Sequence, residues 1–102
     1  MDTVLKSIKT ILGNNFKNEI VKFILIGSRT RDIKMDNSDY DIIIVTNSFV
    51  DSYDFIKHAT RYVSQISFEN NSKIEIYPIK KQNLNNSSSQ FINNVILNGI
   101  EF

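Results

Sequence analysis

Hydrophobic and polar positions change their spacing along the chain in a way that predicts six elements. Some segments carry apolar residues every three or four positions, as on one face of a helix, and others carry short apolar runs or alternations, as in strands. The predicted elements are a helix over 2–16, strands over 21–26 and 39–45, a helix over about 51–66, a strand over 73–79 and a helix over about 88–98. Predicted N-caps are Asp2 or Thr3 and Asp51 or Ser52, and Gly99 is predicted to end the last helix. The apolar residues of that helix are predicted to point inward, namely Phe91, Ile92, Val95 and Ile96.

The order α-β-β-α-β-α predicts an α/β or α+β domain in which helices pack on one face of a small mixed sheet. Polar stretches at 28–38 and 81–90 are predicted loops. Pro78 lacks a backbone N–H, so the third strand is predicted to end there or to lie at a sheet edge. The chain has 102 residues, enough for one modest core, and a single domain over residues 1–102 is expected.

Composition narrows the classes of function. The chain has no cysteine, which excludes a disulfide scaffold, a thiolate nucleophile and a sulfur-ligated metal. Its net charge of +1 gives no overall attraction to nucleic acid, and no continuous basic track runs through the sequence. No apolar run approaches the length of a membrane span and no signal sequence is apparent, so we expect a cytoplasmic protein without membrane contact.

Two carboxylates stand at the start of the second predicted strand, in the stretch DYDIIIV. Because alternate strand residues share a face, Asp39 and Asp41 are expected to point the same way, with Cα atoms roughly 6.5–7 Å apart. Carboxylates about 5 Å apart repel by roughly 3 kcal/mol at an effective dielectric near 20. A hard divalent cation, Mg²⁺ above all, would turn that repulsion into attraction. The alternative is that both residues are solvated at the strand entry.

The end of the first predicted strand, Gly27-Ser28, supplies the second half of a candidate site. Glycine permits close backbone approach, and serine can cap a short helix whose first N–H groups bind an anion. A phosphate held by Ser28 beside a cation held by Asp39 and Asp41 would make a nucleoside triphosphate site.

The stretch GSRTRDIKMDNSDYDIII resembles the signature of the DNA polymerase beta-like nucleotidyltransferase superfamily, a Gly-Ser followed by Asp-x-Asp on the next strand. It is most similar to the minimal nucleotidyltransferases of prokaryotes, whose motif reads Gly-Ser-Arg-x-Arg-Gly and then Ser-Asp-x-Asp. The tail NGIEF extends the resemblance to the last residues given. Asp32 departs from the motif, which has glycine there. The matching residues are Gly27, Ser28, Arg29, Arg31, Ser38, Asp39 and Asp41.

The resemblance implies a polymerase beta palm-like fold and Mg²⁺-dependent transfer of a nucleoside monophosphate, AMP from ATP, to a hydroxyl acceptor. A third acid on a later strand is implied as well, and Glu75 is the candidate, as a metal ligand or general base beside Asp39 and Asp41. Its position in the strand supports this, because alternate residues share a face and Ile74 and Ile76 would then occupy the opposite face of the sheet. The alternative is that Glu75 points outward into solvent. The implied phosphate contacts are Gly27, Ser28, Arg29, Arg31 and Ser38.

Minimal nucleotidyltransferases commonly pair with a helical HEPN-type protein, so the resemblance implies an MntA-type antitoxin that transfers AMP to a tyrosine of a partner toxin. An acceptor surface would then come from the partner or a second subunit, in a hetero- or homo-oligomer. Two alternatives stay open. One is a binding module with weak or absent chemistry, which Asp32 and Glu75 keep open. The other is a nucleotidyltransferase that acts on RNA or a small molecule.

Overall fold

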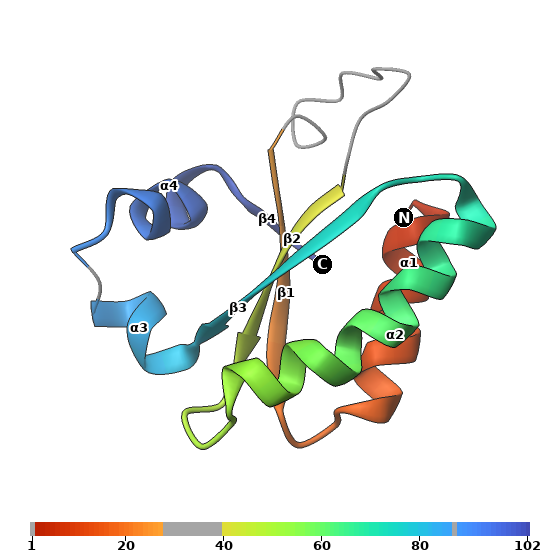
Figure 1. Cartoon of the computed structure of the whole chain (residues 1–102). Helices are drawn as coiled ribbons and strands as arrows, with labels where there is room; N and C mark the ends of the chain where they lie inside the picture. The colour runs from red at the N-terminus through yellow and green to blue at the C-terminus, as the bar shows by residue number, and fades with distance from the viewer. Residues whose placement is uncertain (1, 28–39, 87) are drawn as a thin grey trace.

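The computed structural model describes residues 2–27, 40–86 and 88–102. Its helices and strands are α1 (Thr3–Asn15), β1 (Ile20–Ile26), β2 (Tyr40–Thr46), α2 (Ser52–Asn70), β3 (Ile74–Lys80), α3 (Lys81–Asn86), α4 (Gln90–Asn98) and β4 (Ile100–Glu101). Figure 1 shows them in three layers, with α3 and α4 on the left, the strands in the middle, and α1 and α2 on the right. No helix in the described ranges is long and apolar enough to cross a membrane.

The strands form one mixed sheet with the order β3-β2-β1-β4. β1 is antiparallel to β2 and β4, and β2 is parallel to β3. Helix α2 lies between β2 and β3 in the chain, as a parallel pair requires, because a tight turn would reverse the strand direction. The predicted fold class and mixed sheet are confirmed. Pro78 lies on β3, an edge strand of this sheet, which confirms its predicted position.

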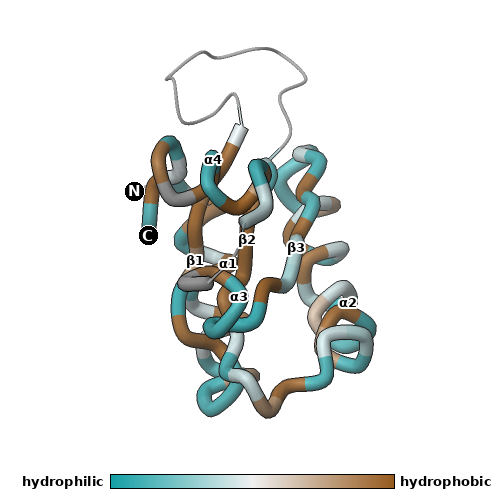
Figure 2. Tube along the Cα trace, turned by 90° about the vertical axis from the view of Figure 1, so that its left-hand side faces the viewer, coloured by the Kyte–Doolittle hydropathy of each residue, from teal (hydrophilic) through white to brown (hydrophobic). Residues whose placement is uncertain are grey.

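Strand β2 is the centre of the core because it is covered on both faces. Ile42 and Ile44 belong to the hydrophobic cluster formed with α1 and α2, whereas Ile43 and Val45 pack with residues of α3 and α4. All four side chains are fully buried. Burial on both sides explains why the strand reads as a continuous apolar run and does not alternate. Figure 2 shows the hydrophobic strands β1 and β2 in brown, among helices that carry hydrophilic, teal segments.

Two predicted N-caps are confirmed, and one of them ties helix to sheet. Asp2 accepts a hydrogen bond from the backbone N–H of Val4 at 2.7 Å, and its other carboxylate oxygen accepts one from the buried Tyr40 hydroxyl at 2.6 Å. Asp51 accepts from the N–H of Asp54 at 3.0 Å at the start of α2. A residue that caps α1 therefore also fixes the first residue of β2.

Three predictions that concern the C-terminal part of the chain are wrong. Residues 81–86, predicted as loop, form α3, because Leu84 supplies a buried anchor in an otherwise polar stretch. Helices therefore cover both faces of the sheet and not one, since Leu84 and Val95 pack on the face opposite α1 and α2. Phe91, predicted to point inward, is 50% exposed. The two-residue β4, which pairs with β1, has too few residues for a periodic signal.

Gly99 does follow the last helix as predicted, for a different reason. Its φ of −75° lies outside the left-handed region that usually selects glycine at a helix end. A Cβ at this position would instead stand 2.5 Å from Cγ2 of Ile24. Glycine is needed because the chain passes close to β1 as it enters β4.

Candidate active site

Three described residues that the sequence analysis selected lie at adjacent ends of neighbouring strands. Gly27 directly follows β1, Asp41 is the second residue of β2, and Glu75 is the second residue of β3. In the sheet register, Asp41 lies opposite Ile26 on one side and opposite Glu75 on the other. Residues opposite one another on neighbouring strands lie about 4.8 Å apart. The topology thus brings together residues that are 14 and 34 positions apart in the sequence.

Asp41 and Glu75 lie on the same face of the sheet. Tyr40 and Ile42, the neighbours of Asp41, are buried in the cluster with α1 and α2, and Ile74 and Ile76, the neighbours of Glu75, pack against it. Because strand side chains alternate, the two carboxylates point to the opposite face, toward the side of α3 and α4. The prediction that Glu75 lies on the face opposite Ile74 and Ile76 is confirmed, whereas the prediction that Asp39 and Asp41 share a face involves a residue outside the described ranges.

Gly27 has the backbone conformation that its position requires. Its φ is +83°, in the region that side-chain-bearing residues rarely adopt. A Cβ on residue 27 would stand 3.0 Å from Oδ2 of Asp41. The absence of a side chain therefore lets the Asp41 carboxylate lie over the end of β1.

Two residues outside the predicted set hold the Glu75 carboxylate. The Tyr77 hydroxyl donates a hydrogen bond to Glu75 Oε2 at 2.6 Å, and Lys73 Nζ lies 3.3 Å from Oε1. The same hydroxyl lies 3.4 Å from Oδ1 of Asp41. A phenol has a single proton, and the shorter distance directs it to Glu75. Asp41 thus presents one oxygen toward Gly27 and the other toward Tyr77.

These contacts shift two pKa values in opposite directions. The Tyr77 hydrogen bond, followed by the hydrogen bond and charge of Lys73, lowers the pKa of Glu75. The hydrogen bond to Glu75, together with desolvation and the charge of Asp41, raises the pKa of Tyr77 to about 12. At neutral pH the glutamate is therefore ionised and the phenol neutral. A carboxylate in this state is a better cation ligand than general base, because a base works best with a pKa near the working pH.

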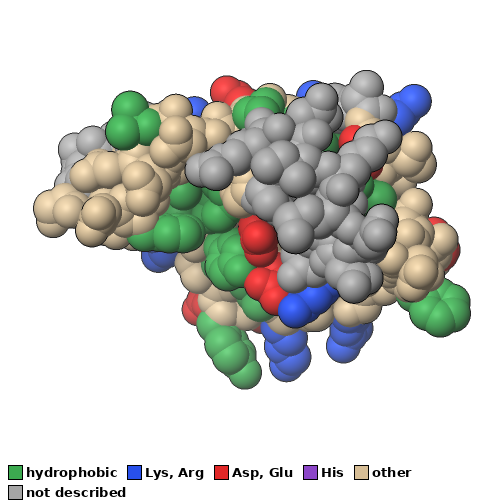
Figure 3. Space-filling view, turned by 90° about the horizontal axis from the view of Figure 1, so that it is seen from above, with side chains coloured by type: hydrophobic (Ala, Val, Ile, Leu, Met, Phe, Trp, Pro, Cys, Tyr) green, Lys and Arg blue, Asp and Glu red, His purple; other side chains and the backbone are tan. Residues whose placement is uncertain are grey.

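The donor set fits a hard divalent cation. Carboxylate oxygens are the ligands that Mg²⁺ prefers, and the carboxylates of Asp41 and Glu75 stand side by side on adjacent strands. Asp39, Ser28, Arg29, Arg31 and Ser38 fall outside the described residues, as does Asp32. Within residues 2–27, 40–86 and 88–102 no group of three acidic or histidine side chains gathers at one point. Figure 3 views this end of the molecule from above and shows acidic side chains in red next to a basic one in blue.

Sequence reasoning missed Tyr77 and Lys73 as parts of the site, although their spacing of two positions from Glu75 indicates that they lie near it. Tyr77 shares the face of Glu75 because the two are two positions apart on β3, and Lys73 directly precedes that strand, two positions before Glu75.

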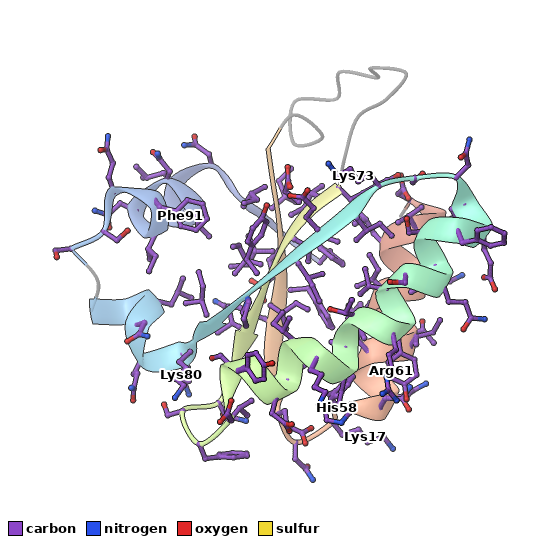
Figure 4. The ribbon with its side chains drawn as sticks, in the orientation of Figure 1. Lys17, His58, Arg61, Lys73, Lys80 and Phe91 are labelled. Atoms are coloured by element: carbon purple, nitrogen blue, oxygen red, sulfur yellow. The ribbon has the colours of Figure 1, made fainter. Side chains whose placement is uncertain are left out.

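His58 lies away from this site. It is exposed on α2, with Nδ1 3.7 Å from Oδ1 of Asp54, and Figure 4 shows it near Lys17, at the end of the molecule opposite Lys73.

Comparison with known proteins decides the family. Residues 6–102 match the profile of the family described as Polymerase beta, Nucleotidyltransferase. The chain is a polymerase beta-type nucleotidyltransferase. The match spans nearly all of the sequence and includes Gly27, Asp41 and Glu75. No curated protein sequence matches the chain.

Two solved structures share the nucleotidyltransferase fold. One is a protein of Sulfolobus solfataricus provisionally described as a nucleotidyltransferase, with a TM-score of 0.66 and 18% identity over 97% of this chain and 76% of the other. The other is a mutant of the toxin–antitoxin MntA–HpeT in which two aspartates are replaced by glutamates. Its TM-score is 0.62, with 17% identity over 98% of this chain and 71% of that one. At these identities the likeness shows the fold.

Proposed function

We propose that this nucleotidyltransferase uses Mg²⁺ to transfer AMP from ATP to a hydroxyl of a partner protein, within one domain over residues 1–102. The observation that carries the proposal is the juxtaposition of Asp41 and Glu75, in register on one sheet face, with Gly27 beneath the Asp41 carboxylate. A cation site next to a strand end without a side chain is the arrangement that a metal-bound triphosphate needs. Membership of the nucleotidyltransferase family supports the reaction class.

Each selected residue has a role in this proposal. Asp39, Asp41 and Glu75 would hold the metal, which when bound neutralises charge on the phosphates and on the departing pyrophosphate. The lowered pKa of Glu75 favours the ligand role over proton abstraction. Gly27 lets the phosphates approach its backbone closely, because it carries no side chain of its own. The residues assigned to phosphate binding are Gly27, Ser28, Arg29, Arg31 and Ser38.

The proposed acceptor is a tyrosine of a HEPN-type toxin, with the nucleotidyltransferase acting as its MntA-type antitoxin. The motif from Gly27 to Asp41 resembles the minimal nucleotidyltransferases that pair with such proteins. A structural neighbour with the same fold belongs, by its description, to a toxin–antitoxin pair named MntA–HpeT. Nucleotide transfer to the toxin would then inactivate it by covalent change.

A labelling experiment tests this function. The purified chain is incubated with Mg²⁺, ATP labelled on the α-phosphate and the product of the adjacent gene, beside Asp41→Asn and the control Asp54→Asn, which alters an exposed aspartate of α2. Label on a tyrosine of the neighbour with wild type and Asp54→Asn, and none with Asp41→Asn, supports the proposal. Inhibition of the neighbour without label, equal in all three proteins, would identify a binding module. Label on RNA or a small molecule alone would identify another acceptor class.

A further inference from the structure

The Glu75 carboxylate is held at both of its oxygens by different side chains. Tyr77 donates to Oε2 at 2.6 Å and Lys73 lies 3.3 Å from Oε1. The Tyr77 hydroxyl also lies 3.4 Å from Asp41 Oδ1, so it stands within reach of one oxygen of each carboxylate. Glu75 and Tyr77 occupy alternate positions of β3 and so share a face, and Lys73 directly precedes the strand, two positions before Glu75.

We propose that Tyr77, assisted by Lys73, is a positioning residue for the metal site, which holds the Glu75 carboxylate in place beside Asp41 so that both can bind one divalent cation. This inference rests on the proposed function and adds the outer contacts of its metal site. Tyr77 would act through Glu75, because Mg²⁺ prefers carboxylate oxygens and a phenol that keeps its proton is a donor to them.

Glu75 needs such contacts because its arm is long and partly solvated. Its side chain has one more rotatable bond than an aspartate, and 41% of its surface is exposed. A free glutamate at this position would sample several rotamers and lose that freedom on binding a cation. The contacts with Tyr77 and Lys73 restrict the Glu75 side chain before a cation binds, which reduces this loss.

The contacts leave room for a cation. An ionised carboxylate has about four lone-pair sites on its two oxygens. Tyr77 and Lys73 each use one oxygen of Glu75, so each oxygen keeps acceptor capacity. Partners that hold a metal-binding side chain in this way typically contribute 10- to 100-fold to metal affinity.

Tyr77 is not needed to hold β3 in the sheet. Ile74 and Ile76, on the other face of the strand, pack against the core, whereas Tyr77 is 37% exposed. Removal of its hydroxyl should therefore leave the fold intact while it frees the Glu75 carboxylate.

The test is a cation titration of the full chain with Mn²⁺, followed by electron paramagnetic resonance, and with Mg²⁺, followed by the shift in Tm. The proteins are wild type, Tyr77→Phe, Lys73→Met, Glu75→Gln, the double variant Tyr77→Phe/Glu75→Gln, and the control Tyr53→Phe, which alters a tyrosine that is 82% exposed. We expect Tyr77→Phe to bind the cation about 10-fold more weakly, with only a small fall in Tm in the absence of metal, because one partly exposed hydrogen bond is lost. Tyr53→Phe should match wild type. In the Glu75→Gln background, Tyr77→Phe should have no further effect.

The outcomes separate this inference from the proposed function. Equal cation affinity in wild type and Tyr77→Phe overturns the positioning role and leaves the metal site standing. A similar loss from Tyr77→Phe with and without Glu75 also overturns it, because the effect would then not pass through Glu75. No cation binding by wild type contradicts the proposed function itself. An adenylyl group found on Tyr77 by mass spectrometry after incubation with ATP would make Tyr77 an acceptor and reject the inference.

Discussion

The Asp41 carboxylate lies over Gly27, with its Oδ2 atom 3.0 Å from the point where a Cβ of residue 27 would stand. Gly27 also has a φ of +83°. Two separate constraints therefore favour glycine at the end of β1, one from the backbone and one from the acid on the neighbouring strand. This relationship links the proposed phosphate contact to the proposed metal ligand.

Replacement of Gly27 by alanine should damage both stability and the site. A left-handed conformation costs an L-residue roughly 1–2 kcal/mol, and the new Cβ would push the Asp41 carboxylate aside. We expect Gly27→Ala to lower the free energy of unfolding by about that amount and to weaken Mg²⁺ binding. Urea unfolding and a Mg²⁺ titration measure the two effects.

Gly13→Ala is the matched control. Gly13 lies inside α1, and apart from the neighbouring backbone of that helix a Cβ there would have no atom within 4 Å. Because alanine favours a helix interior over glycine by roughly 0.5–1 kcal/mol, this variant should be more stable than wild type and bind Mg²⁺ equally well. A stabilising Gly27→Ala would contradict the described geometry.

Two leucine substitutions test the second helical layer. Leu84 on α3 is 7% exposed and Leu97 on α4 is 78% exposed. Leu84→Ala should lower the free energy of unfolding by about 2–3 kcal/mol, near the lower end of buried leucine truncations, because α3 is short. Leu97→Ala should change it by less than about 0.5 kcal/mol. Equal effects in chemical denaturation would show that α3 does not pack on the sheet.

The phenol of Tyr77 should lose its proton at a higher pH than an ordinary tyrosine. Its pKa is raised to about 12 by the hydrogen bond to Glu75 and by the nearby negative charges. The protonated phenol therefore stabilises the folded state. This stabilisation is complete below pH 10 and is lost as the pH rises through 12. Glu75→Gln should lower the Tyr77 pKa toward 10, because the negative charge is removed. The phenolate absorbance of each protein, minus that of the same protein with Tyr77→Phe, isolates this residue among the four tyrosines. An unchanged pKa in Glu75→Gln would contradict the contact.

Sequence periodicity was sufficient for the elements that form the sheet and its first helical layer. α1, β1, β2, α2 and β3 appear where the apolar spacing predicts them, because each packs an apolar face against the core that is long enough to leave a repeating pattern. The caps at Asp2 and Asp51 follow from their side-chain chemistry. The face of the sheet to which the side chains of Asp41 and Glu75 point follows from strand geometry alone.

The C-terminal region was predictable only in part, for physical reasons. α3 rests on one buried leucine, which cannot produce a periodic pattern. β4 has two residues, and its pairing with β1 is a tertiary contact that the local sequence does not encode. Tyr77 and Lys73 reach Glu75 through side-chain conformations, which strand parity makes possible but does not specify.

Asp41→Asn should remove nucleotide transfer without a loss of fold. The substitution keeps the shape of the side chain but removes one of two facing negative charges, so Tm in the absence of metal should not fall. Loss of a metal ligand forfeits several kcal/mol of charge stabilisation, and each 1.36 kcal/mol is a factor of ten, so transfer should fall by about a hundredfold or more. Asp54→Asn should keep wild-type transfer. Full activity of a folded Asp41→Asn protein would exclude Asp41 from the site.

The central claim is that Asp41 and Glu75 bind one divalent cation next to Gly27. Its most direct test is a crystal structure of the chain grown with Mn²⁺ and a non-hydrolysable ATP analogue, in which the anomalous signal locates the metal. We predict a peak within ligand-bond distance of oxygens from both carboxylates, with the triphosphate against Gly27. A peak bound elsewhere, or nucleotide bound with no metal at these two acids, would contradict the account.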